Sequence, residues 1–216
     1  MLHPKNLLNL LLVLFIALVL FIGGVYLNKR DVIQSGAVRN PIYETSIDEQ
    51  ARLQSYAHQL KTFASLHHYN TSVCFLADMK LHSGKYRFFV YDMEKDIVKS
   101  AGLVAHGSCK TLFLVKAKFS NTPNCNCSSI GKYKVSAKYK GRFGYAFKLI
   151  GLDSSNSNAY KRSIVLHRYS CIPEEEAYPL PICNSLGCPM VANAFFQVLT
   201  AEIDHSKKPV LLWMLP

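Results

Sequence analysis

The chain has 216 residues, which is enough for one domain with a sizeable core and an appendage. Half of the residues are hydrophobic, which excludes a disordered basic protein. The formal net charge of +11 is typical of nucleic-acid-binding proteins, so its location has to be established first. Twelve Lys and Arg but only one acid, Asp153, lie from Lys110 to Arg168, and the remaining basic and acidic residues cancel. The whole surplus of positive charge is therefore confined to one segment.

The N-terminal segment predicts the compartment. Residues 7–27 contain no charged side chain, and their length matches the roughly 20 apolar residues that cross a bilayer. A cleaved signal peptide is the alternative, although its apolar region is normally shorter. We expect residues 1–28 to be a transmembrane anchor or signal segment and residues 29–45 to be a linker. The remainder would then lie outside the cytoplasm, in the cell envelope or periplasm, where nucleic acid is not an expected partner.

The seven cysteines fit an oxidising compartment. Six of them could form up to three disulfides, in any of 15 pairings that the sequence does not distinguish, or could be small buried residues. They are Cys74, Cys109, Cys125, Cys127, Cys171 and Cys183. The spacing of Cys125 and Cys127 is shorter than that of zinc ligands and no second pair follows, so no metal or cofactor is expected.

A helix is predicted at the start of the folded part, within residues 46–70. Ser46 and Glu49 form a capping box. Apolar residues then recur at helical spacing over about 20 residues, at Leu53, Ala57, Leu60 and Ala64. We expect this helix to pack on the domain without taking part in chemistry.

The rest of the chain, residues 71–216, is predicted to form one mostly β domain. Its β-rich runs are 73–77, 86–91, 96–104, 133–139, 145–149 and 163–168. A second helix is predicted from an apolar stripe at Val191, Ala194, Phe195, Val198 and Leu199, and residues 210–213 indicate a last strand.

The strongest chemical signal is the segment from Ser185 to Pro189. Pro189 is typical of the first turn of a helix, so we expect Cys188 at a helix N-terminus, where the macrodipole would lower the thiol pKa. Gly187 would let backbone amides face an oxyanion. His167, at the end of an apolar strand, is the expected base, and His106 is a second candidate.

These residues resemble the active-site signature of the L,D-transpeptidases (YkuD-type), in which a histidine precedes a Ser-x-Gly-Cys motif. The resemblance extends from about residue 72 to residue 214 and is closest to the murein L,D-transpeptidase-like branch common in Bacteroidota. It rests on His106-Gly-Ser-Cys109, Phe119-Ser-Asn121, Ser128-Ser-Ile-Gly-Lys-Tyr133, Gly151-Leu-Asp153, Asn156-Ser-Asn-Ala159, Arg162, Ile164-Val-Leu-His167 and Gly187-Cys-Pro-Met-Val191. The fold that it implies is a mainly β sandwich or barrel with a helix following the nucleophile.

The resemblance implies a cysteine-dependent enzyme that acts on peptidoglycan stem peptides. Cys188 would attack the carbonyl that follows an L-centre, His167 would be the base, and the amides of Gly187 and Cys188 would hold the oxyanion. A backbone carbonyl, expected here at Arg168, would orient His167, and Ser185 would brace the loop.

The substrate contacts expected from the resemblance are His106, Gly107, Tyr133, Tyr145 and Arg162, although tyrosines alternating in strands are more often core residues. Asp153 could orient a donor or form an ion pair with a lysine. One departure is Leu186, where many members of the family have a histidine, so any role of that side chain is lost here.

Two other functions remain open from the sequence. The same Cys188 and His167 pair would serve an L,D-carboxypeptidase or another thiol hydrolase. A non-catalytic envelope module could instead bind anionic glycans through the basic segment, in which case binding would depend steeply on salt and on Lys132, Lys134 and Lys138. The sequence does not indicate an oligomeric state.

Overall fold

The computed structural model describes residues 46–142 and 144–216. The predicted anchor at residues 1–28 and the linker at residues 29–45 lie outside the described residues. Within the described residues, no helix has the length and apolar character needed to span a membrane.

Helix α2 (Ile47–Leu66) begins where the capping box predicts. The Ser46 Oγ accepts a hydrogen bond from the Glu49 N–H at 3.3 Å, which satisfies one of the unpaired donors at the helix start. Its four buried residues are the four that the periodicity singles out: Leu53, Ala57, Leu60 and Ala64. The predicted packing helix is thus confirmed.

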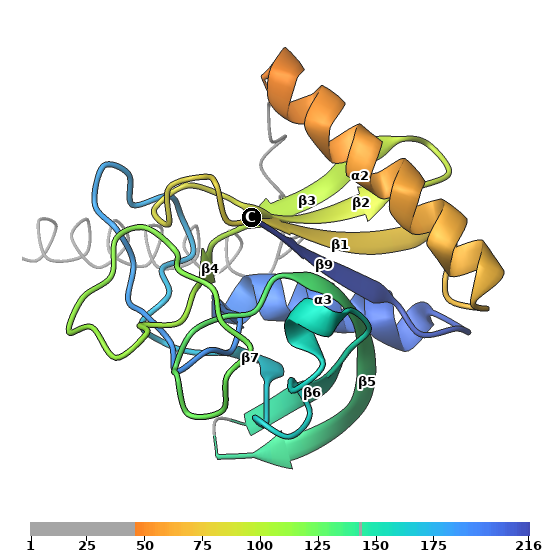
Figure 1. Ribbon diagram of the computed structural model, residues 1–216. Helices are drawn as coiled ribbons and strands as arrows, with labels where there is room; N and C mark the ends of the chain where they lie inside the picture. The colour runs from red at the N-terminus through yellow and green to blue at the C-terminus, as the bar shows by residue number, and fades with distance from the viewer. Residues whose placement is uncertain (1–45, 143) are drawn as a thin grey trace, which may run out of the picture. The chain divides into compact units, whose positions relative to one another are not determined.

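The strands form one nine-stranded sheet in the order β3-β2-β1-β9-β5-β6-β7-β8-β4 (Figure 1). Their bounds are β1 (Val73–Asp78), β2 (Phe88–Asp92), β3 (Ile97–Gly102), β4 (Val104–Ala105), β5 (Gly131–Gly141), β6 (Gly144–Gly151), β7 (Val165–Arg168), β8 (Met190–Val191) and β9 (Leu211–Leu215). Strands β3 and β4 stand at opposite ends of this order, yet only Leu103 separates them in the chain. Because the Cα atoms of Gly102 and Val104 can be at most about 7 Å apart, the sheet must curl until its two ends meet. The fold is a nearly closed, mainly β barrel.

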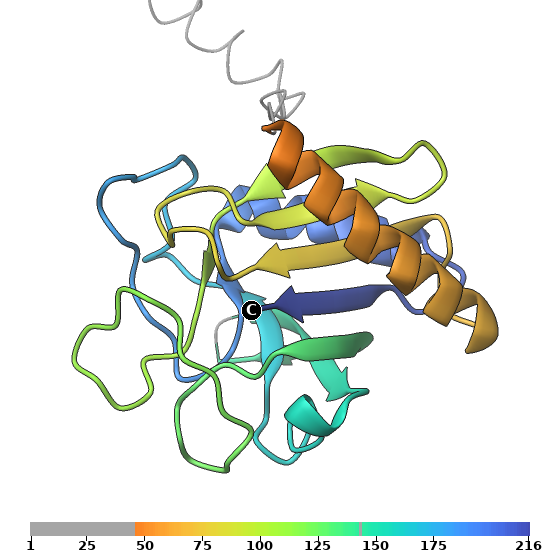
Figure 2. The same cartoon turned by 45° about the horizontal axis from the view of Figure 1, so that its top comes forward.

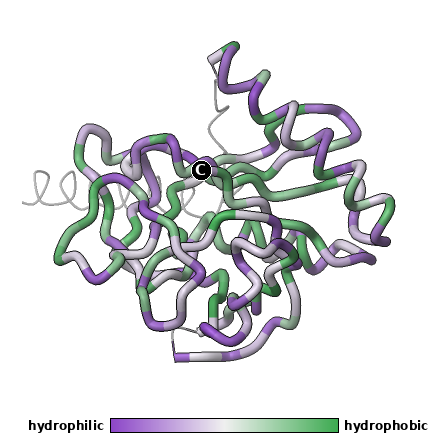
Figure 3. Tube along the Cα trace, viewed as in Figure 1, coloured by the Kyte–Doolittle hydropathy of each residue, from purple (hydrophilic) through white to green (hydrophobic). Residues whose placement is uncertain are grey.

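Two helices cover opposite faces of the sheet, as Figure 2 shows for α2 and α3 (Asn193–His205). Strand β1 is buried on both faces: Cys74 and Leu76 pack with α2, whereas Phe75 and Ala77 join the larger core beneath α3. Hydrophobic residues accordingly gather in the strands around the C-terminus of the chain (Figure 3). A single turn of 3-10 helix, η1 (Ser154–Asn156), connects β6 to the segment before β7.

The structure corrects two predicted elements. The run at residues 96–104 is two strands, because the sheet turns its edge at Leu103. The second helix begins at Asn193, because Met190 and Val191 form strand β8, which pairs with β7 on one side and β4 on the other. Val191 therefore belongs to the sheet, and the proline before it leads into a strand.

Candidate active site

The loop that carries Cys188 is held by hydrogen bonds at both ends. The Ser185 N–H donates to the His106 carbonyl at 2.9 Å, and the Ser185 carbonyl accepts from the Ser108 N–H at 2.9 Å. The Ser185 Oγ accepts from the Gly187 N–H at 3.0 Å. Gly187 has a φ of +117°, which favours glycine. The expected bracing role of Ser185 therefore has a direct structural counterpart.

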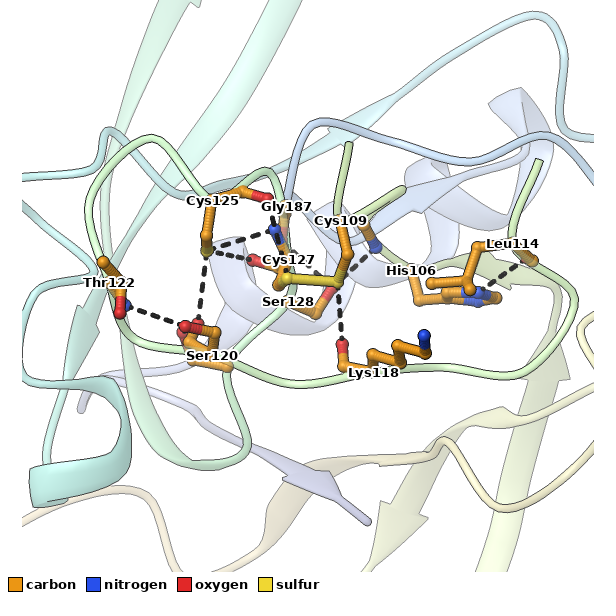
Figure 4. The surroundings of a disulfide bond; sticks show 12 residues. His106, Cys109, Leu114, Lys118, Ser120, Thr122, Cys125, Cys127, Ser128 and Gly187 are labelled. Atoms are coloured by element: carbon orange, nitrogen blue, oxygen red, sulfur yellow. Dashed lines mark hydrogen bonds between the residues drawn. A yellow bond between two sulfur atoms is a disulfide. The ribbon is translucent and has the colours of Figure 1, made fainter. Parts of the chain in front are cut away.

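A second segment packs behind this loop (Figure 4). The Ser128 Oγ accepts from the Gly107 N–H at 3.0 Å and donates to the Gly187 carbonyl at 3.2 Å, so it ties two loops together. The Cys109–Cys127 disulfide links the segment of Ser128 to the loop that contains Gly107 a second time. A Cβ at Gly187 would lie 2.9 Å from the Cys127 carbonyl oxygen, which leaves no room for a side chain there. The backbone around Cys188 is thus fixed from behind.

The Cys188 thiol lies against the backbone that leads into β7. The Val165 N–H donates to its Sγ at 3.5 Å, and the thiol donates to the Ser163 carbonyl at 3.8 Å. Ser163 has a φ of +56°, a left-handed conformation that costs a residue other than glycine about 1–2 kcal/mol. This conformation accompanies the approach of the Ser163 carbonyl to the thiol.

The expected position of Cys188 at a helix N-terminus is wrong. Strand β8 separates it from α3, and the N-terminal amide of that helix at Ala194 donates to the Glu174 carboxylate at 3.0 Å. The pKa prediction is wrong as well, since burial raises the pKa of the Cys188 thiol above its usual value. The Val165 hydrogen bond and the charge of Arg162 act in the opposite direction without outweighing burial.

His167 lies on strand β7 next to the loop that carries Cys188. Its N–H donates to the Pro189 carbonyl at 3.4 Å, and its register partner on β8 is Met190, two residues after Cys188. The Nδ1 atom lies 3.0 Å from the Arg168 carbonyl oxygen, as expected. Because a carbonyl oxygen only accepts, Nδ1 carries the proton and Nε2 presents a lone pair. Burial lowers the pKa of His167, which keeps the ring neutral near pH 7.

The Gly187 amide is committed to Ser185, so the expected oxyanion hole is altered. In the described residues, the Cys188 N–H has no hydrogen-bond acceptor. Of the two expected donors, this amide alone is available to a developing oxyanion in this conformation. The Leu186 side chain is 73% exposed, so the residue at the departure from the family pattern extends into solvent.

His106 and Arg87 form a buried polar cluster beneath the site. The Arg87 guanidinium donates to the Val104 carbonyl at 2.7 and 3.0 Å, to the Leu81 carbonyl at 3.0 Å and to the His106 Nδ1 at 2.9 Å. The His106 Nε2 lies 3.1 Å from the Leu114 carbonyl oxygen. Both ring nitrogens are therefore used inside the protein. Burial, helped by the charge of Arg87, lowers the pKa of His106 to about 4.

We expect this buried histidine to make the domain sensitive to acid. An unfolded histidine titrates near pH 6.5, so below that pH the unfolded chain binds a proton that folded His106 accepts only near pH 4. The contribution of neutral His106 to the free energy of unfolding is fully present above pH 6.5. It decreases by about 3 kcal/mol as the pH falls toward 4. Urea unfolding at pH 7 and pH 4 measures the loss, and a His106→Gln variant should lose less. An identical pH dependence in both proteins would contradict the assignment.

Three expected substrate contacts are structural residues in this fold. His106 and Tyr133 are fully buried, and the Tyr133 hydroxyl donates to the Ser129 carbonyl at 2.7 Å. Gly107 is also buried, and a Cβ there would lie 2.2 Å from the Asn126 carbonyl oxygen, so the site admits no side chain. The surrounding core buries these groups in this structure, which the sequence pattern alone does not reveal.

Arg162 and Tyr145 are the two expected substrate contacts that are not buried. The Arg162 guanidinium donates to the Ser120 carbonyl at 2.9 Å, to the Cys127 carbonyl and to the Cys125 Sγ at 3.4 Å, so it braces the loop and supplies positive charge near the thiol. Arg162 is partly exposed, and its contact with a substrate stays a prediction. Tyr145 is 54% exposed, but it precedes Ala146, the register partner of His167, and therefore lies on the opposite side of the sheet from His167.

The remaining cysteines and Asp153 have structural roles. Two disulfides form, Cys109–Cys127 and Cys171–Cys183, while Cys74 and Cys125 are free thiols. The described residues contain no group of three or more His, Cys, Asp or Glu side chains that could hold a metal ion. Asp153 forms an ion pair with Lys132 at 2.8 Å, the alternative that the sequence left open.

Sequence reasoning missed Arg87 and the bridging role of Ser128. Arg87 lies in a predicted strand, where a single basic residue normally indicates an exposed position, and nothing local shows that the core encloses it. Ser128 begins the Ser-Ser-x-Gly-x-Tyr motif, so the motif marked the residue without showing what it contacts.

Comparison with known proteins identifies the family. A family model described as "L,D-transpeptidase catalytic domain" matches residues 47–212. A search of curated proteins found no match. Similar solved structures include an L,D-transpeptidase from Xylanimonas cellulosilytica, with 14% identity and a TM-score of 0.39, covering 66% of this chain and 60% of that one. An L,D-transpeptidase from Mycobacterium smegmatis has 12% identity and a TM-score of 0.38, covering 67% and 59%.

The helical cell shape determining protein Pgp2 from Campylobacter jejuni has 13% identity and a TM-score of 0.42, covering 66% of this chain and 47% of that one. The chain thus spans less than two thirds of the length of each of these structures. The assignment rests on the family model, which covers the sheet, both helices and the loop with Cys188. The chain belongs to the family of L,D-transpeptidase catalytic domains.

Proposed function

We propose that this domain is a cysteine-dependent L,D-transpeptidase that acts on peptidoglycan stem peptides through a thioester. The observation that carries the proposal is the joint placement of two residues. Strand β7 contacts the Cys188 thiol through the Val165 N–H, and two residues later it carries His167, whose Nδ1 is held by the Arg168 carbonyl. A nucleophile and an oriented base on hydrogen-bonded neighbouring segments are what acyl transfer requires.

In the acylation step, His167 Nε2 takes the proton from the Cys188 thiol while the sulfur attacks the carbonyl carbon that follows the L-centre of a stem peptide. The carbonyl oxygen becomes an oxyanion, and the Cys188 N–H is the available donor for it. Collapse of this intermediate breaks the C–N bond. The protonated imidazole returns its proton to the leaving amine, which departs as the terminal D-amino acid.

In the second step, the thioester is resolved by a nucleophile whose proton His167 again accepts. The side-chain amine of a second stem gives a new amide crosslink, whereas water gives a shortened stem. Both routes restore the Cys188 thiol, so the same residues would serve a transpeptidase and a carboxypeptidase. Competition between amine and water in the occupied site determines the ratio.

The resting site is a neutral pair. Burial raises the pKa of the Cys188 thiol and lowers that of the His167 imidazole, and both shifts favour thiol and imidazole over thiolate and imidazolium. The proton therefore moves during the attack, which gives His167 the role of a general base.

We also propose that the domain works outside the cytoplasm, tethered by residues 7–27. Two disulfides in the domain support this placement, since disulfides persist in oxidising compartments. The net positive charge would then attract the carboxylates of wall peptides.

The test is product analysis with the purified protein and defined stem tetrapeptides, with and without an acceptor stem. We expect mass spectrometry to detect an acyl group on Cys188, together with crosslinked dimers, tripeptides or both. Tripeptides alone would favour the carboxypeptidase alternative. If neither product forms and Cys188 is not acylated, the proposed function is wrong and the non-catalytic binding module becomes the better hypothesis.

A further inference from the structure

A pocket with a volume of about 320 Å³ opens beside the nucleophile. It is lined by Tyr139, Lys148, Tyr160, Ser163, Ile164 and Val165. Two of these residues are also the direct contacts of the Cys188 sulfur, namely Ser163 through its carbonyl and Val165 through its N–H. A group bound in this pocket would therefore be a near neighbour of the reacting thiol.

Lys148 is the charged residue of the pocket. It lies opposite Val165 in the pairing of β6 with β7, and Ala146, two residues earlier, lies opposite His167. Residues two apart in a strand share a face, so Lys148 and His167 are on the same side of the sheet. Phe147 and Leu166, on the other side, are buried in the core.

Two aromatic rings hold the Lys148 ammonium in the pocket. It lies 5.8 Å from the Tyr139 ring centroid and 5.5 Å from the Tyr160 ring centroid. Such contacts orient a cation but leave its hydrogen-bond donors unused. No carboxylate in the described part of the chain forms an ion pair with Lys148, whereas Lys132 pairs with Asp153 and Lys138 with Asp204.

We propose that this pocket is a carboxylate subsite, in which Lys148 binds a carboxylate of the acyl-donor peptide next to the scissile bond. The inference rests on the proposed function for the identity of the peptide. A stem tetrapeptide carries carboxylates at its C-terminus, on a diamino-acid side chain in some stems, and on its second residue. All three offer the same chemistry to Lys148, so the experiment has to distinguish them.

The experiment measures binding rather than turnover. Isothermal titration of the Cys188→Ala protein with a diaminopimelate-containing stem tetrapeptide is repeated in proteins that also carry Lys148→Gln, Lys148→Arg or Lys140→Gln. Lys140 is the matched control because it is an exposed lysine on the same β5–β6 hairpin that does not line the pocket. Three further peptides each have one of the carboxylates converted to an amide.

We expect Lys148→Gln to weaken binding about ten-fold or more, because a charge-assisted hydrogen bond is lost. Lys148→Arg should retain most of the affinity, and Lys140→Gln should change it less than about two-fold, as for an exposed charge. One of the amidated peptides should bind weakly to the protein that retains Lys148, and the Lys148→Gln substitution should not weaken its binding further. That peptide identifies the carboxylate that the pocket holds.

Equal affinities for the Lys148 and Lys148→Gln proteins would overturn the subsite, as would an equal loss with every amidated peptide. These outcomes do not depend on catalysis. If the subsite is wrong, the protein with Cys188 still acylates and releases product from the same tetrapeptide. If the proposed function is wrong, that protein forms no product whether or not the peptide binds.

Discussion

Replacing Cys188 with alanine is expected to abolish turnover of stem peptides, with a loss of about 10⁴-fold or more, as for other covalent nucleophiles. The sulfur is the only atom of that residue that can form the thioester. The surrounding backbone stays in place because the hydroxyls of Ser185 and Ser128 bind the N–H and the carbonyl of Gly187. Initial rates of D-amino acid release measure the effect. Circular dichroism should show an unchanged fold.

The matched control is Cys125→Ser, which alters a second free thiol near the same loop and keeps a hydrogen-bonding atom for Arg162. It should retain most of the activity. His167→Ala should lose about 10²–10⁴-fold, the usual contribution of a general base. Full activity of Cys188→Ala, or loss in Cys125→Ser alone, would mean that the nucleophile has been assigned to the wrong residue.

Replacing Arg87 with methionine is expected to destabilise the domain by about 3–5 kcal/mol, the cost of breaking a buried charge cluster. Methionine fills much of the volume but leaves the Val104 and Leu81 carbonyls and the His106 Nδ1 without their donor. The effect is large because Arg87 is 1% exposed and water does not take its place. Urea unfolding at pH 7 measures the change in free energy.

Two further proteins make this measurement decisive. Arg87→Lys keeps the charge but offers a single point donor, so an intermediate loss is expected, and it remains informative if the methionine variant does not fold. Lys95→Met, at an exposed position in the turn between β2 and β3, should change stability by less than about 0.5 kcal/mol. A loss below about 1 kcal/mol for Arg87→Met would show that the cluster contributes little to folding.

Local features of the fold could be predicted because they depend on neighbouring residues. The capping box at Ser46 and the four apolar residues of α2 follow from helical geometry alone. The strands at 73–77 and 145–149 follow from β-rich composition. Strand β8 was missed because two residues have no periodicity, and they are a strand only because β7 and β4 lie on either side.

The candidate site likewise has some features that could be predicted from the sequence and others that could not. The order of His167, Ser185 and Cys188 could be recognised in the sequence. The support of the His167 ring by the Arg168 carbonyl could also be predicted, because Arg168 directly follows His167 in the chain. Burial of His106 and the raised pKa of Cys188 depend on which distant segments cover them, and no local pattern encodes that. The pocket around Lys148 likewise arises only when β5, β6 and the segment before β7 come together.

The position of β9 has a consequence for the order of folding. This strand contains residues 211–215, yet it lies in the middle of the sheet, between β1 and β5, where it pairs in parallel with one and antiparallel with the other. Until those residues leave the ribosome, no strand pairs with both β1 and β5, although α3 can already pack on both groups of strands. Cys188 and His167 are synthesised before β9, so the hydrogen-bonded sheet around them is complete only after β9 pairs with β1 and β5.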